Sequence, residues 1–171
     1  KPKSMNLDLV RNSNKKKSLF LISSSDHVIL SSPFHLDYCK QLNMNHSATY
    51  IPCSIDTNRL TTKKTDDTNK KIVLGWTGTF SSIVWLDLLR DVLIELNKTE
   101  QFKVLLITNF DYSFPGIDMD VIRWDKESEV EDLHKIDIGL YPLSRDKWTL
   151  GKGGLKVLQY MSIGIPSVAT N

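Results

Sequence analysis

The segment 137–170 constrains the fold of this chain most, because it has the pattern of a complete βαβ unit. It predicts an apolar strand at 138–141, then a polar loop and the glycine pair 153–154. A helix is predicted over 155–163, and a second strand begins at Ser167. The first N–H groups of a helix have no intrahelical partner and carry the positive end of the helix dipole. An anion such as a phosphate group therefore suits this corner. A tight turn without a ligand is the alternative.

The preceding part of the chain alternates strand and helix patterns in the same way. Apolar runs predict strands at 72–75, 103–107 and 121–124, and 3-to-4 spacing predicts helices at 81–96 and 128–134. Strands that alternate with helices through short loops form a parallel sheet covered by helices. The predicted fold class is therefore α/β, with a Rossmann-like parallel sheet flanked by helices, preceded by the end of a second Rossmann-like domain.

The first 60 residues predict fewer elements. We expect a helix at 4–22, a strand at 27–30, a helix at 34–42 and a strand at 48–51. The stretch 61–71 contains no apolar residue, which marks a solvated linker between two domains. Residues 1–60 are too few for an independent Rossmann-like domain. They are expected to be the incomplete C-terminal part of one domain, and 72–171 a second domain truncated at its end. The alternative is a short, complete natural protein.

Three segments resemble one enzyme family. Residues 153–168 resemble the donor-nucleotide signature of the retaining GT-B glycosyltransferases of family 4. Residues 26–56 resemble the segment that closes the N-terminal domain in that family, and 71–78 resemble the first strand and glycine loop of its donor-binding domain. The resemblance implies transfer of a sugar from a nucleotide-diphosphate sugar to a glycan or lipid-linked acceptor, with retention and without a cofactor or bound metal. The chain would hold the end of the acceptor domain and most of the donor domain.

The resemblance also implies which residues bind the nucleotide-sugar. Gly153, Gly154 and Leu155 would offer backbone N–H groups to the diphosphate. Lys152, Lys156 and Arg145 would supply positive charge. Gln159 would contact the ribose. The catalytic groups are not assigned. The predicted nucleotide-sugar-binding residues are Gly78, Thr79, Arg145, Lys152, Gly153, Gly154, Leu155, Lys156 and Gln159.

The chain departs from the family pattern at four positions. The two glutamates that hold the sugar and the ribose correspond to Gly151 and Gln159, and the positions of an Arg and a Lys near the diphosphate correspond to Trp76 and Ser82. These departures support the alternative of a noncatalytic Rossmann-like binding or scaffold module. A flavodoxin-like binder has less support, because no acidic cluster of receiver type follows the predicted strands.

Composition narrows the partners and the compartment. The net charge of +2 by itself implies nothing global about partners, and no nucleic-acid partner is expected. No apolar run approaches the length of a membrane span. Cys39 and Cys53 lack the spacing of metal ligands and are expected to be reduced thiols, which favours the cytoplasm. The basic run 15–17 is expected to be a solvated face. Its alternative is attraction to anionic lipid, which would place the protein peripherally at the inner face of the membrane. The histidines and the acidic residues 125–132 are not expected to bind metal.

Overall fold

The computed structural model describes residues 7–64 and 71–170, with side chains from residue 14 onward. The described chain forms two compact units. The first comprises the residues up to Cys53 together with 150–153, and the second comprises 54–149 together with the residues from Gly154 onward.

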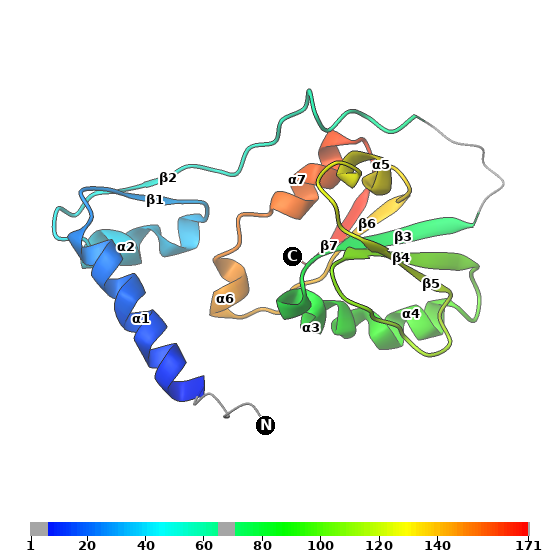
Figure 1. Ribbon diagram of the computed structural model, residues 1–171, viewed down its shortest axis with the longest axis horizontal. Helices are drawn as coiled ribbons and strands as arrows, with labels where there is room; N and C mark the ends of the chain where they lie inside the picture. The colour runs from blue at the N-terminus through cyan, green and yellow to red at the C-terminus, as the bar shows by residue number, and fades with distance from the viewer. Residues whose placement is uncertain (1–6, 65–70, 171) are drawn as a thin grey trace. The chain divides into compact units, whose positions relative to one another are not determined.

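A five-stranded parallel sheet forms the second unit (Figure 1). Its strands are β3 (Ile72–Thr77), β4 (Phe102–Thr108), β5 (Met119–Arg123), β6 (Ile138–Tyr141) and β7 (Ser167–Ala169), in the order β5-β4-β3-β6-β7. The chain runs from β3 outward to β5 and then returns to the other side of β3. The order therefore reverses between β3 and β6, the kind of position at which α/β sheets bind ligands. The predicted strands and fold class are confirmed.

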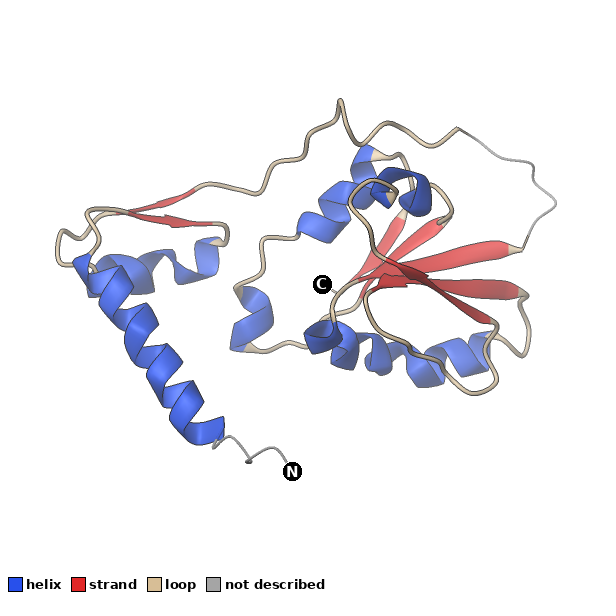
Figure 2. Ribbon diagram, viewed as in Figure 1, coloured by secondary structure: helices blue, strands red, loops and turns tan. Residues whose placement is uncertain are grey.

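Helical segments cover both faces of this sheet (Figure 2). Between β3 and β4 lie η2, α3, η3 and α4 on one face, and α5 and α7 lie on the other face. Their bounds are η2 (Phe80–Ser82), α3 (Ile83–Leu86), η3 (Asp87–Leu89), α4 (Arg90–Leu96), α5 (Glu129–Leu133), α6 (Lys147–Leu150) and α7 (Leu155–Ser162).

Two predictions about these helices were wrong in detail. The continuous helix predicted over 81–96 is interrupted by 3-10 turns, and α6 lies where only a polar loop was expected. At the interruption, the Asp87 carboxylate accepts hydrogen bonds from Arg90, at 2.7 Å, and from the Tyr112 hydroxyl. Helix α6 is a single turn of four residues, which is too short to show a helical period in the sequence.

Strand β4 places its side chains in two separate apolar cores. Val104 and Leu106 point into the core shared with α3 and α4, whereas Leu105 and Ile107 point into the core shared with α5 and α7. All four side chains are at most 5% exposed. Burying each side chain of this size contributes about 1.5 to 3 kcal/mol. Both faces of the strand must therefore remain covered for the unit to be stable.

Helix α7 packs closely on β6 through a glycine. A Cβ atom at Gly139 would lie 2.4 Å from the ring of Tyr160, which is fully buried. The Tyr160 hydroxyl donates weakly to the carbonyl of Leu140, at 3.4 Å, and burial raises the pKa of this phenol. The absence of a side chain at Gly139 thus lets α7 approach the sheet.

The first unit has a much smaller core. It contains α1 (Leu7–Ser24), β1 (Val28–Leu30), η1 (Pro33–His35), α2 (Leu36–Leu42) and β2 (Ala48–Tyr50), with β1 and β2 paired in parallel. The predicted order of elements is confirmed, but the helix predicted over 34–42 begins as the separate 3-10 turn η1, and residues 4–6 of the first predicted helix lie outside the described residues. Among its described residues, the buried apolar side chains are those of Cys39 and Ala48. Asn43 is fully buried and joins the end of α1 to the turn before β2, donating to the carbonyls of Ile22 and Ser25 at 2.8 Å.

The boundary between the units precedes the linker expected at 61–71. Residues from Ser54 onward group with the second unit, because Leu60 is buried beside Ile55 in the core under α5 and α7. Lys63 continues this attachment: its backbone N–H donates to the carbonyl of Ile163 at 2.8 Å. Residues 65–70 of the expected linker lie outside the described residues.

We predict that Gly139→Ala destabilises the second unit by about 1 to 3 kcal/mol, because the added methyl group overlaps the Tyr160 ring. Urea unfolding of the single variants and of Gly139→Ala/Tyr160→Leu measures the coupling. The double variant should be more stable than the sum of the single effects, since the smaller side chain makes room. Gly116→Ala is the control for coupling: its Cβ would meet nothing within 4 Å, so its cost comes from its left-handed φ of 84° and should simply add to that of Tyr160→Leu. Additive effects at Gly139 and Tyr160 would contradict the packing argument.

We also predict unequal hydrogen exchange in the two units. Amides of β4 should exchange only on global unfolding of the second unit, whereas amides of β1 and β2 should exchange through low-energy opening, because few apolar groups cover them. Exchange followed by mass spectrometry of peptic fragments would measure this. Equal protection of β1 and β4 would contradict this prediction, because it would mean that the small apolar core does not limit the stability of the first unit.

Candidate functional site

A cavity of about 340 Å³ lies at the carboxyl ends of β3, β4 and β5 in the second unit. Parallel strands of an α/β sheet present their ligands at this edge. Four of the lining residues directly follow strands or end them, and α7 contributes a lysine. The lining residues are Thr77, Gly78, Thr79, Ile107, Asn109, Trp124 and Lys156.

The loop after β3 forms one wall and is held by its own hydrogen bonds. The Gly78 N–H donates to the carbonyl of Ile107 at 3.3 Å, and the Thr79 N–H donates to Ser82 Oγ at 3.0 Å. Ser82 Oγ in turn donates to the Thr79 carbonyl at 2.8 Å. A Cβ at Gly78 would lie 2.4 Å from the Trp76 ring, so glycine is required there for space. Because both N–H groups already have acceptors, this loop shapes the cavity rather than offering backbone donors.

The start of α7 has the donors that this loop lacks. Gly154 precedes the helix with a left-handed φ of 71° and provides no side-chain cap. The N–H groups of the first three helical residues, 155–157, have no intrahelical acceptor by their position. Glycine adopts a left-handed backbone conformation without a steric penalty, so this conformation alone explains why residue 154 is a glycine. The helix start therefore carries partial positive charge beside the Lys156 side chain.

Lys156 is the cation of the cavity. Among the described residues, no carboxylate lies within 4 Å of its ammonium group. Burial lowers the pKa of Lys156 below its ordinary value, and the negative charge of nearby Glu129 opposes this shift. A half-buried ammonium group without an ion-pair partner is stabilised by an anionic ligand.

Glu129 organises the polar groups behind the cavity. It is 8% exposed, and its Oε2 pairs with Arg59 Nη2 at 2.8 Å. Its Oε1 accepts from Trp124 Nε1 at 3.1 Å and from Gln159 Nε2 at 3.3 Å. The remaining amide oxygen of Gln159 is buried without a partner among the described residues. One carboxylate thus joins the segment before β3, the end of β5 and helix α7.

The structure brings together part of the predicted site. Gly78, Thr79 and Lys156 line one cavity, and Gly154 and Leu155 begin the helix beside it. Gln159 lies one turn further on, bound to Glu129.

Three predicted residues are not among those that line the cavity. Arg145 is exposed and does not line the cavity. Lys152 and Gly153 group with the first unit, where a Cβ at Gly153 would lie 2.6 Å from Cys53 Sγ. Burial lowers the pKa of Lys152. Close packing against Cys53 therefore explains why residue 153 is a glycine, without any ligand.

The sequence reasoning missed several residues of the site. Asn109 and Trp124 directly follow the strands β4 and β5, and position after a parallel strand was a signal that could have found them. Glu129 was read only as part of an acidic helix start, and nothing local indicates its pairing with Arg59.

Comparison of the sequence with protein-family models and with curated proteins gave no match. Within residues 7–64 and 71–170, no group of three His, Cys, Asp or Glu side chains could hold a metal ion. The helices of the described chain are also too short or too polar to cross a bilayer.

We predict that Lys156→Met stabilises the unliganded protein at pH 7 by about 0.5 to 2 kcal/mol, the usual range for a single stabilising substitution, because it removes a charge that is partly buried. The folded-state pKa of Lys156 lies below the ordinary value of 10.5, so the native state binds fewer protons than the unfolded state as pH rises toward that value. The penalty for the charged lysine is complete below the folded-state pKa and disappears as pH approaches 10.5.

Urea midpoints of wild type and Lys156→Met at pH 7 and pH 10 would measure this effect. The advantage of the variant should shrink at the higher pH. Lys147→Met is the control, because Lys147 is exposed and lies outside the cavity lining. A constant difference between the two pH values would mean that burial of the charge is not its cause.

Proposed function

We propose that the second unit binds a nucleotide-diphosphate sugar in this cavity and that the chain belongs to a glycosyltransferase of GT-B type. The sugar would pass to a glycan or lipid-linked acceptor with retention of configuration. One observation carries the proposal: Lys156, half-buried and without an ion-pair partner among the described residues, lines a cavity at the carboxyl ends of parallel strands from the start of α7.

The electrostatics of this corner suit a diphosphate. The first-turn N–H groups of α7 and Lys156 belong to the same helical turn, so both would act on an anion bound at the start of this helix. During sugar transfer, the bond from the anomeric carbon to the diphosphate oxygen breaks, and negative charge grows on the departing diphosphate. Fixed donors and a cation at that place stabilise the charge without reorganising at the moment of reaction. Lys156 would therefore contribute to rate as well as to binding.

The departures from the family pattern favour a second candidate, a noncatalytic binding or scaffold module. Trp76 is 3% exposed within the apolar core, so it offers nothing to a ligand. Ser82 is occupied in holding Thr79, and Gly151 has no side chain. This leaves Lys156 as the single cation among the residues that line the cavity.

Calorimetric titration of the 171-residue chain with UDP and GDP tests the proposal. At least one should bind at millimolar concentration or tighter, and the corresponding nucleotide-sugar should compete with it. Lys156→Ala should weaken binding by about 1.5 to 3 kcal/mol, the usual loss for a hydrogen bond to a charged group. Lys147→Ala should leave it unchanged.

Failure of a folded wild-type chain to bind either nucleotide would support the noncatalytic module. Equal affinity of wild type and Lys156→Ala would remove this lysine from the site. Binding of the nucleotide together with hydrolysis or transfer of the sugar would exclude the noncatalytic module.

A further inference from the structure

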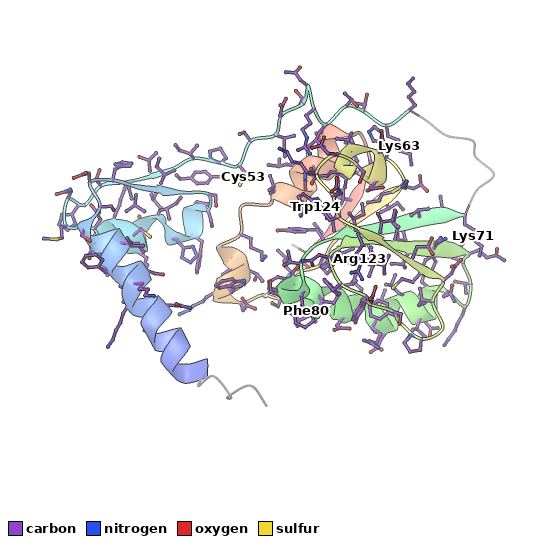
Figure 3. The ribbon with its side chains drawn as sticks, in the orientation of Figure 1. Cys53, Lys63, Lys71, Phe80, Arg123 and Trp124 are labelled. Carbon is purple, nitrogen blue, oxygen red and sulfur yellow. The ribbon has the colours of Figure 1, made fainter. Side chains whose placement is uncertain are left out.

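Trp124 leaves much of its ring uncovered at the cavity wall. Trp124 directly follows β5 (Figure 3). Its side chain is 48% exposed and lines the cavity. Its backbone N–H donates to the carbonyl of Thr108 at 2.9 Å, which continues the pairing of β5 with β4. The main chain at Trp124 is therefore fixed by the sheet. An exposed indole on a fixed backbone is suited to contact with a flat ligand group.

The orientation of the indole ring is fixed as well. Its Nε1–H donates to Glu129 Oε1 at 3.1 Å, and the other oxygen of that carboxylate is paired with Arg59. Arg59 also donates to the carbonyl of Lys126 at 3.0 Å, at the turn before α5. A buried carboxylate held from two sides can therefore keep the polar edge of the indole turned toward the protein. The remaining ring surface is apolar.

We propose that Trp124 is the stacking surface for the nucleobase of the ligand and that Glu129 is the residue that positions it. This inference rests on the proposed nucleotide function of the same cavity. A cavity with a cation on one wall and an open aromatic ring on another fits a ligand that carries both an anion and a planar ring. A nucleotide has both groups.

A sugar ring can also stack on an indole, but the surrounding groups favour a base. A stacked sugar needs several polar partners for its hydroxyl groups. The Thr79 hydroxyl is already bonded to Ser81 Oγ at 3.0 Å, and Ile107 is apolar. Asn109 is exposed at the cavity, and its amide offers a donor and an acceptor side by side. That combination matches the edge of a nucleobase.

The base contribution can be separated from the phosphate contribution by calorimetry. Wild type is titrated with UMP, GMP, ribose 5-phosphate, glucose 1-phosphate and inorganic pyrophosphate. At least one nucleotide should bind about tenfold or more tightly than ribose 5-phosphate, given the strength of base stacking on aromatic side chains. Trp124→Leu should abolish that advantage while leaving pyrophosphate affinity unchanged, and Trp124→Phe should retain most of it. Trp148→Leu is the control, because Trp148 is exposed outside the cavity.

The positioning role of Glu129 has its own comparison. Glu129→Gln keeps an oxygen acceptor for the indole N–H and should retain most of the tenfold advantage of the nucleotide, whereas Glu129→Leu should lose it. Pyrophosphate binding by Glu129→Leu shows that the fold and the phosphate subsite are intact. If Glu129→Leu does not fold, Arg59→Met removes the support of the carboxylate from outside the core and should reduce the same advantage.

The outcomes distinguish this inference from the proposed function. Equal binding of the nucleotides and ribose 5-phosphate, with pyrophosphate bound, would overturn the stacking role and leave the phosphate subsite in place. Tighter, Trp124-dependent binding of glucose 1-phosphate would assign the ring to a sugar and also overturn the proposal. Absence of binding by every probe would overturn both.

Discussion

The burial of β4 on both faces is the constraint on which the second unit depends. Val104 and Leu106 require cover on one side, and Leu105 and Ile107 require it on the other. A parallel strand buried in this way needs helices above and below the sheet. The chain supplies them through crossovers, and these place the loops that follow β3, β4 and β5 at one edge. The cavity lies at that edge, so the site is a consequence of how the core is covered.

Close packing connects that core to the site. Because Gly139 has no side chain, Tyr160 lies directly against β6, and α7 is held at a short distance from the sheet. Lys156 lies one turn before Tyr160 on the same helix. The packing of Tyr160 therefore fixes the distance between the sheet and the part of α7 that carries Lys156. The burial that lowers the pKa of this lysine also leaves it in need of an anion. Stability and ligand binding therefore make opposed demands on one side chain.

The sequence predicted the secondary structure of the second unit well where local pattern decides it. Apolar, β-branched runs predicted β3, β4 and β6, because strands buried on both faces are continuously apolar. The break in the helix after β3 was not predictable, since it involves Asp87 bound to Tyr112 from a distant loop. The extent of the unit was also missed, because Leu60 is an isolated apolar residue whose burial depends on a core formed far along the chain.

By itself the sequence determined an α/β unit with a glycine-led helix start and a lysine in its first turn, since each of these features is local. Only the tertiary structure decided which residues share the site. Glu129 acquires its role through contacts with three other parts of the chain, and neither composition nor spacing encodes those contacts. The distant residues that meet at or behind the cavity are Arg59, Asn109, Trp124, Glu129 and Gln159. Their meeting depends on the order of parallel strands and the depth of helix packing, which are properties of the folded core.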